Sequence, residues 1–505
     1  MYTKGIPLSI DTFSRKTARH LVPRTAIDWS VETGVSKTTA TLQVVVNAKL
    51  MPGETVRENA YAAFRELNAD YVRYVPWFPY PHQSVAELEP PTETTTSWDF
   101  THVDPPTLDF LEATKGRSPI LNFSTIPGWM FVDGQPDYPV APREIFFTYN
   151  QGVDLVDPSG KQVGDYFARL VSWYTNGGFT DELGKWHESG HHFELPLWEV
   201  LNEADIEHDM TPHSYTERYD VIVEAIRQVS PTTQFVGLGI ARPSLDPEYF
   251  EYFLNPANHQ EGIPLDWISY HFYAIPALSE TIDDWQHSLF AQADGFINTV
   301  RSIESIRKRL SPSTRTMINE VGIILAEDEL IVHGADMGEP DFPVEYWNLA
   351  GALFAHLVVE LTRLGIDVIG ESQLVGYPQQ FPSVSMVDWN TGQPNARFRI
   401  LELVRESIAP GDLLVQDPQG AELQGRGRIL GVPDRMPFLH EGERRVLLVN
   451  RTGRTVSTEL PGALGGIVRV VDTESAGGAI RTSDVESDSI DLGPYAVACV
   501  RFPAL

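Results

Sequence analysis

Two asparagine–glutamate pairs lie at the ends of two apolar runs. Asn202 and Glu203 end the run ELPLWEVLNE, and Asn319 and Glu320 end TRTMINE, 117 residues further on (320 − 203). A carboxylate at the end of a buried strand is costly unless it has partners or a chemical task. Glycoside hydrolysis needs two carboxyl groups flanking the scissile bond, one protonated and one ionised. The pairs therefore indicate a candidate hydrolytic site.

The elements around these pairs predict how the two glutamates could meet. From about residue 40 to 405, strand-like runs alternate with helix-like runs such as ETVRENAYAAFREL, whose apolar residues fall on one helical face. Eight strand-like runs are counted from TLQVVVN onward, which predicts an α/β protein with a (β/α)8 TIM barrel. Glu203 follows the fourth strand and Glu320 the seventh. A barrel would bring both to the face where its strands end.

The chain divides into three predicted parts. Residues 1–40 form an N-terminal segment, which we expect to add a strand to the C-terminal domain through TAIDWSVETG. Residues 41–405 form the barrel. In residues 406–505, β-rich pieces alternate with Gly, Asn, Asp and Ser, and no long amphipathic helix is present. This pattern predicts an accessory antiparallel β-sandwich.

The run PLWEVLNEAD resembles the acid/base signature of the clan A glycoside hydrolases. The resemblance is nearest to glycoside hydrolase family 39, which includes β-xylosidases and α-L-iduronidases. WDFTHVDPPTLDFLEATKGRSPIL and DWISYHFY follow in the family's order, and a β-sandwich trails the barrel. The resemblance extends from about residue 40 to the C-terminus. It implies a retaining enzyme with the acid/base after strand four and the nucleophile after strand seven.

By this resemblance Glu203 is the acid/base and Glu320 the nucleophile. Asn202 is expected to hydrogen-bond the sugar 2-hydroxyl. Arg73 matches an arginine close to the nucleophile, where a fixed cation would keep Glu320 ionised. Glu199 has the strand parity of Glu203, so we expect it inside the barrel as a supporting residue.

Further residues are expected to contact the substrate. His271 and Tyr273, on the sixth strand, match positions that line the family's site. Trp77 and Trp129 lie in predicted loops near the open face, where aromatic rings could stack on a sugar. Gln373 follows the eighth strand, where the family commonly has a tryptophan platform.

These residues favour a retaining, exo-acting glycoside hydrolase of oligo- or polysaccharides that needs no cofactor. Two alternatives remain open: an endo-acting clan A glycanase and a non-catalytic carbohydrate-binding barrel. A third reading comes from HESGH (187–191), which matches the zinc-protease pattern H-E-x-x-H. Gly190 weakens the helix that this pattern requires, and no third ligand is evident, so we expect no metal here.

Composition limits the partners and the compartment. The 505-residue chain has 69 acidic and 38 basic residues, a net charge of −31, which disfavours nucleic acid as a partner. No run is long and apolar enough to predict a membrane span. The first residues lack the apolar core of a signal peptide, which predicts a cytoplasmic protein, or a secreted one if a signal had been removed. Cys499 is the only cysteine, so no internal disulfide is expected, and the oligomeric state is left open.

Overall fold

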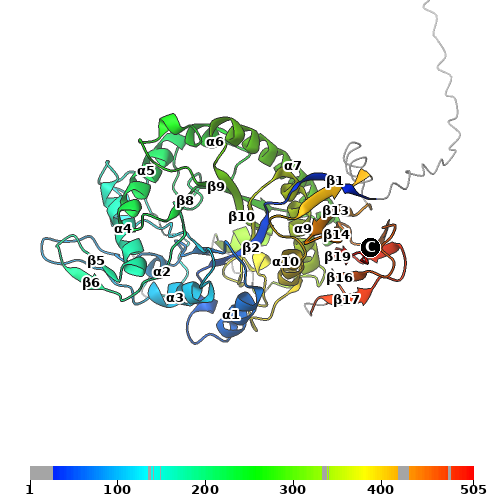
Figure 1. Cartoon of the computed structure of the whole chain (residues 1–505). Coiled ribbons are helices and arrows are strands. Elements are labelled where there is room, and N and C mark those ends of the chain that lie inside the picture. The colour runs from blue at the N-terminus through cyan, green and yellow to red at the C-terminus, as the bar shows by residue number, and fades with distance from the viewer. Residues whose placement is uncertain are drawn as a thin grey trace, which may run out of the picture.

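A computed structural model describes residues 27–134, 138–139, 141–147, 149, 151–332, 338, 340–418, 431–475 and 479–504. Eight parallel strands close a barrel in the order β10–β11–β2–β3–β4–β7–β8–β9 (Figure 1). Their bounds are β2 (Thr39–Val45), β3 (Arg73–Val75), β4 (Ile120–Leu121), β7 (Leu197–Glu199), β8 (Gln234–Ile240), β9 (Trp267–Ala274), β10 (Arg315–Ile323) and β11 (Val368–Glu371). The predicted (β/α)8 barrel is confirmed.

Helices join successive strands and cover the outside of the barrel (Figure 1). The longer ones are α1 (Thr55–Leu67), α3 (Asp104–Ala113), α4 (Lys161–Thr175), α5 (Pro212–Val229), α7 (Ile282–Leu310), α9 (Tyr346–Leu364) and α10 (Ala396–Ser407). Shorter ones are α2 (Pro81–Ser84), α6 (Glu248–Phe253) and α8 (Ala326–Val332). The apolar face expected for α1 is buried, because Val56, Ala60, Phe64 and Leu67 all pack into the core. None of the helices in the described ranges combines the length and apolarity that a bilayer span requires.

The inside of the barrel changes from apolar to polar along the strands. An apolar cluster fills the end where the strands begin, made of Ile120, Leu197, Val236, Trp267, Met317 and Val368. Because side chains alternate along a strand, the next inward residues lie two positions further on. On four strands these are Asn122, Glu199, Ser269 and Asn319, all buried. The polar layer therefore lies directly beneath the open face.

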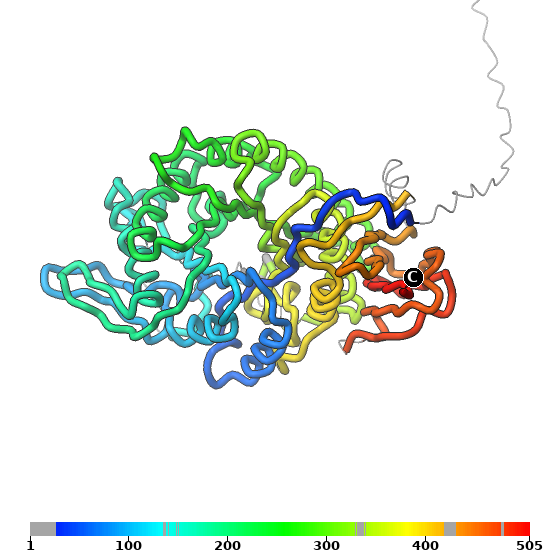
Figure 2. Tube along the Cα trace, in the orientation of Figure 1, coloured from blue at the N-terminus to red at the C-terminus, as the bar shows by residue number. Residues whose placement is uncertain are grey.

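The C-terminal part is an antiparallel sheet in the order β1–β12–β13–β14–β19–β16–β17. Its bounds are β1 (Asp28–Val35), β12 (Leu413–Gln416), β13 (Asp434–His440), β14 (Glu443–Val449), β16 (Ile467–Val471), β17 (Arg481–Asp484) and β19 (Val497–Arg501). A two-stranded sheet, β15 (Val456–Glu459) with β18 (Ser489–Leu492), accompanies it. The first strand runs beside β12 (Figure 2), so the chain enters this sheet before it enters the barrel. Residues 1–26 of the predicted N-terminal segment lie outside the described ranges.

The HESGH segment is not helical. His187 lies on β6 (Trp186–Glu188), which forms a hairpin with β5 (Gly178–Thr180). Its imidazole is 2.8 Å from Asp181, whereas His191 lies beyond the hairpin with Asp104 at 3.6 Å. Two histidines with separate carboxylate partners do not form the one-faced helical pair of a zinc protease. The segment that matches the zinc-protease pattern therefore begins in a β-hairpin rather than in a helix.

Candidate active site

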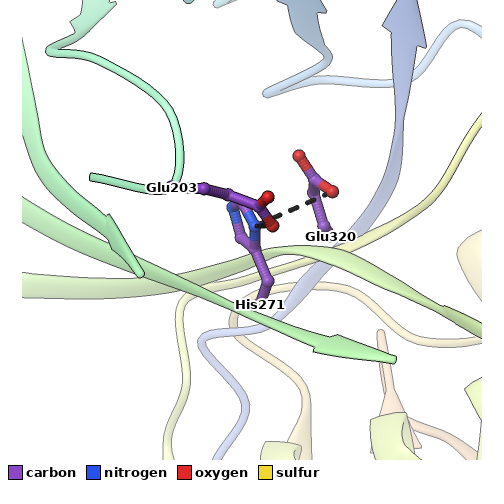
Figure 3. A group of neighbouring side chains, drawn as sticks. All are labelled: Glu203, His271 and Glu320. Atoms are coloured by element: carbon purple, nitrogen blue, oxygen red, sulfur yellow. Dashed lines mark hydrogen bonds and ion pairs between the residues drawn. The ribbon is translucent and has the colours of Figure 1, made fainter. Parts of the chain in front are cut away.

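Glu203 and Glu320 face one another at the end of the barrel where the strands finish (Figure 3). One carboxylate oxygen of Glu203 lies within 4.8 Å of one carboxylate oxygen of Glu320, and a nitrogen of His271 lies within the same distance of both. Both glutamates line a cavity of about 700 Å³. The two strand ends that the sequence singles out thus meet at one site.

The backbone at Glu203 is unusual. Leu201 and Glu203 have φ angles of 63° and 43°, in the left-handed region that side chains other than glycine rarely adopt. The Glu203 N–H donates to the carbonyl of Gly239 at 2.8 Å, which ties this turn to the end of β8. Strained conformations of this kind persist only where the surrounding structure holds them in place, and they are frequent at functional sites.

Glu320 lies among groups that favour its ionised form. Arg73 donates to its Oε1, Tyr273 donates to its Oε2 at 2.5 Å, and His271 Nδ1 lies 3.7 Å from Oε2. Burial alone would raise the pKa of Glu320, but the charges of His271 and Arg73 and the hydrogen bonds from Tyr273 and Arg73 lower it overall. Gly322 leaves room for the Tyr273 ring, since a Cβ there would lie 3.1 Å from it.

Glu203 lies in the opposite kind of environment. Burial raises its pKa, and the nearby charge of Glu320 adds to the effect. A hydrogen bond with His271 Nδ1, 2.9 Å away, limits the rise. Burial lowers the pKa of His271, but Glu320 and Glu203 raise it above its ordinary value overall. Two carboxyl groups whose pKa values are driven apart are the signature of an acid paired with a base.

Glu199 lies beneath the pair and is fully buried. It accepts hydrogen bonds from Arg73, from Asn122 and Asn319 at 2.7 Å, and from Ser269 at 2.5 Å. Because these donors occupy its carboxylate and Arg73 balances its charge, Glu199 supports the site from below. Its geometry agrees with the supporting place expected for it inside the barrel.

A third carboxyl group, that of Glu207, borders the cavity. Its Oε1 accepts from Trp77 Nε1 at 2.7 Å and from Asn202 Nδ2 at 3.0 Å, while its buried Oε2 has no hydrogen-bond partner among the described residues. Burial raises the pKa of Glu207 well above its ordinary value, and the charge of Glu203 raises it further. Both effects favour the protonated, neutral form of Glu207.

Most of the predicted site residues come together here. Those that line the cavity are Trp77, Asn202, Glu203, His271, Tyr273, Glu320 and Gln373. Arg73 lies beneath it, fully buried, and donates to Gln43, Glu199, Asn202 and Glu320. Trp129 does not line the cavity. Its indole instead donates to the backbone carbonyl of Glu87 at 2.9 Å. The substrate contact expected of Trp129 therefore does not fit its position, whereas Arg73 lies next to Glu320, as expected.

The lining residues that the sequence did not single out include three polar residues close to the two glutamates and their partners, Gln43, Glu207 and Ser372. Gln43 Nε2 donates to Ser372 Oγ at 2.6 Å, and the hydroxyl oxygen of Tyr273, whose own proton goes to Glu320, lies 2.7 Å from the same Ser372 oxygen. Gln43 is the one strongly polar residue inside the run TLQVVV, and that was a usable signal. Nothing in the local sequence distinguishes Glu207 from a solvated glutamate.

Glu203, His271 and Glu320 are also the one group of three or more His, Cys, Asp or Glu donors close enough to hold a metal within the described ranges. The donor set does not suit a cation. Arg73 already bonds the Glu320 carboxylate, and the raised pKa of His271 favours a protonated imidazole, which cannot ligate. The charges instead suit proton transfer and nucleophilic attack.

Comparison with known proteins supports this view of the barrel. The family model for glycosyl hydrolases family 39 matches residues 65–313, and that for the D-apionate lactonase C-terminal immunoglobulin-like domain matches residues 439–500. No curated protein sequence matched the chain. The first match includes Arg73, Glu203 and His271 and ends before Glu320.

Solved structures share the fold across almost the whole chain. A family 30 endoxylanase from Clostridium papyrosolvens has 10% identity and a TM-score of 0.55, with 95% of this chain and 99% of that one covered. A family 51 arabinofuranosidase from Xanthomonas axonopodis pv. citri has 12% identity and a TM-score of 0.61, with the same coverage. A family 51 α-L-arabinofuranosidase from Bifidobacterium longum has 13% identity and a TM-score of 0.60, with 95% and 98% covered.

The closed barrel, its sheet domain and the family match define a glycoside hydrolase of the clan A fold. The protein is a glycosidase that acts on carbohydrate, and within its class the matched part of the barrel is similar to glycosyl hydrolase family 39.

Proposed function

We propose that the protein is a retaining, exo-acting glycosidase in which Glu203 is the acid/base and Glu320 the nucleophile. The observation that supports this most is the spacing of the pair, with carboxylate oxygens within 4.8 Å of each other. Retaining enzymes hold the two carboxyl groups about 5–5.5 Å apart, whereas inverting enzymes leave about 6.5–9.5 Å for a water molecule. The opposite pKa shifts assign the roles, because Glu203 keeps its proton longer and Glu320 loses its proton sooner.

The reaction proceeds in two displacements. Glu203 gives its proton to the glycosidic oxygen while Glu320 attacks the anomeric carbon, so the C–O bond breaks and a glycosyl ester forms. The free alcohol leaves. Water then gives a proton to Glu203 and attacks the same carbon, which frees Glu320 and restores the acid. Asn202, held by Arg73 and Glu207, keeps one amide N–H for a sugar hydroxyl.

The proposal of exo action is supported by a group of aromatic rings at one side of the cavity. The ring of Trp77 lies 5.7 Å from that of Phe147 and 5.9 Å from that of Phe381, and its N–H is fixed by Glu207. These fixed rings limit how many sugar units of the substrate can extend beyond the sugar that is cleaved off. An endo-acting enzyme would need an open groove in this direction.

The experiment uses Glu203→Ala and Glu320→Ala with a dinitrophenyl glycoside and added azide. The substrate is chosen from a panel that begins with xylosides and arabinofuranosides, the sugars named for the similar structures. Glu203→Ala should still form the glycosyl ester, because this leaving group needs little protonation, and azide should restore turnover and give a glycosyl azide of retained configuration. Glu320→Ala should give the inverted azide. Exchanged configurations would reverse the roles, and wild-type activity in both variants would refute the proposal.

Lactone hydrolysis is a second candidate activity of this site, because the C-terminal domain is similar to that of D-apionate lactonase. The matched residues, 439–500, include none of the residues that line the cavity. A pH-stat assay with sugar lactones, run beside the glycoside panel, separates the two. Lactone hydrolysis without glycoside hydrolysis would favour the lactonase.

A further inference from the structure

The cavity has two unlike sides. Around Glu320 the lining includes the hydrogen-bonded side chains of Gln43, Asn202, Tyr273 and Ser372, together with the apolar side chains of Ile324 and Val384. On the side of Glu203 the lining includes a large apolar surface, made of Ile206, Ala241, Pro243, Leu245, Phe272, Ile275 and Phe296. We call this surface the apolar wall.

Part of the apolar wall is built on the turn of Glu203 and on the loop bonded to it, and the rest comes from β9, the residue that follows it and α7. Ile206 follows Glu203 by three residues, and its N–H donates to the Glu203 carbonyl at 2.9 Å. Asp205 accepts from the N–H groups of Ala241 and Arg242, both at 2.9 Å, and so joins this turn to the loop that carries Leu245. On the other side, Phe272 stacks on Phe296 with ring centroids 4.6 Å apart. The wall is thus fixed next to the proton donor.

Three side chains of the wall, those of Ile206, Leu245 and Ile275, remain open to solvent, whereas Pro243 and Phe296 are buried. Leu245 is 73% exposed, the highest value among the large apolar residues described, and Ile206 and Ile275 are 43% and 42% exposed. The amide of Gln292 is occupied by the backbone of Ile275, at 3.0 Å for both bonds. Arg242 and Ser244 lie at the solvent-exposed rim. Clustered exposed apolar residues in a concave site mark a ligand surface.

Resting on the proposed function, we propose that the apolar wall binds the leaving group, and that this group is an apolar alkyl or aryl alcohol rather than a second sugar. The acid must reach the glycosidic oxygen, so the leaving group lies on the Glu203 side. A second sugar would need hydrogen-bond partners for several hydroxyls, and the wall offers few. An apolar group there would bury Ile206, Leu245 and Ile275 and gain the corresponding hydrophobic stabilisation.

The test compares hexyl and methyl glycosides of the sugar that the panel identifies. Their leaving alcohols have nearly the same acidity, so a difference reports binding rather than departure. The kcat/KM value should be at least about tenfold higher for the hexyl glycoside, since each fully buried methylene is worth roughly fourfold. A disaccharide of the same sugar should have the highest KM of the series. Equal kcat/KM values for the two alkyl glycosides would overturn the inference.

Variants of the apolar wall test whether the preference for the hexyl glycoside arises there. Leu245→Ser and Ile275→Thr change exposed side chains, and each should reduce the hexyl-to-methyl ratio severalfold. Leu464→Ser, which changes a 59% exposed leucine of the C-terminal domain, is the matched control and should keep the wild-type ratio. An unchanged ratio in both wall variants would also overturn the inference. Failure to hydrolyse any glycoside, including dinitrophenyl glycosides, would instead refute the proposed function.

Discussion

The indole of Trp77 donates a hydrogen bond to the carboxyl group of Glu207 at 2.7 Å. The two residues come from different barrel loops, one after β3 and one after β7. Asn202 donates to the same oxygen. Glu207 therefore connects Trp77, one of the aromatic rings at the side of the cavity, to Asn202, which is expected to contact the sugar. Neither donor is charged, so a negative charge on Glu207 would be uncompensated.

The neutral state of Glu207 can be tested with an isosteric variant. Glu207→Gln has no charge to lose, and its carbonyl oxygen can accept from both Trp77 and Asn202. We expect it to keep kcat/KM within about threefold of wild type, whereas Glu207→Ala should lose tenfold or more. Steady-state kinetics on a nitrophenyl glycoside would check this. A Gln variant as impaired as the Ala variant would mean that the ionised form is required.

The pH dependence of kcat/KM should be bell-shaped. Glu320 has a lowered pKa and must be ionised, so activity falls on the acid side below the usual glutamate range. Glu203 has a raised pKa and must be protonated, so activity falls on the alkaline side above that range. The charge of His271 lowers both pKa values. In His271→Asn both limbs should therefore move to higher pH, while the 62% exposed His213, changed to Asn, should move neither.

Arg73 should be essential to folding as well as to activity. It is buried and pairs with two buried carboxylates, Glu199 and Glu320. Removing one member of a buried ion pair costs about 3–5 kcal/mol because the partner charge stays behind. Arg73→Met should show this loss in chemical denaturation. Arg309→Met breaks the exposed pair with Glu251 and should cost less than about 1 kcal/mol. Equal losses in the two variants would contradict the buried network.

Glu87 should limit stability at high pH. It is fully buried and forms no ion pair within the described ranges. Burial raises its pKa to about 8, with a contribution from Glu182. The pKa of Glu87 is higher in the folded protein than in the unfolded chain. The free energy of unfolding is therefore largest below pH 4.5, where Glu87 is protonated in both states, and it decreases as the pH rises toward 8. The loss is roughly 1.4 kcal/mol for each pH unit between the two pKa values.

The matched variant for this prediction is Glu87→Gln. It should equal or trail wild type in thermal melting at pH 4 and exceed it at pH 9. The opposite order at pH 9 would show that the carboxylate has a partner when ionised. Glu89→Gln, two residues away and more exposed, serves as the control.

Sequence periodicity predicted the barrel because its signal is distributed over eight strands and the helices between them. The two glutamates could be paired because a barrel places every strand end on one face. Trp129 could not be placed, since the direction of a ring in a loop depends on partners such as the Glu87 carbonyl, which are distant in sequence. For HESGH, Gly190 argued against the helix that a zinc protease needs, and the segment is not helical, but its hairpin was not foreseen because the strands are three residues each.

Glu207 shows a different limit. Its neutral state comes from burial and from the nearness of Glu203 in space, and neither can be read from a spacing of four residues in a loop. Arg73 was expected beside the nucleophile, and its bond to Glu320 agrees with that expectation. Its depth beneath the cavity was not predicted, because the polar layer that surrounds it is assembled from side chains of five other strands and their loops.

The pairing of β1 with β12 has a consequence for how the protein is made. Asp28 lies opposite Gln416, which the ribosome adds 388 residues later (416 − 28). At roughly 5–20 residues per second, β1 waits about 20 to 80 s for its partner. During that time the whole barrel is synthesised between the two strands. The nascent chain therefore carries an unpaired edge throughout translation of its catalytic part, and the antiparallel sheet can close only after that part has emerged.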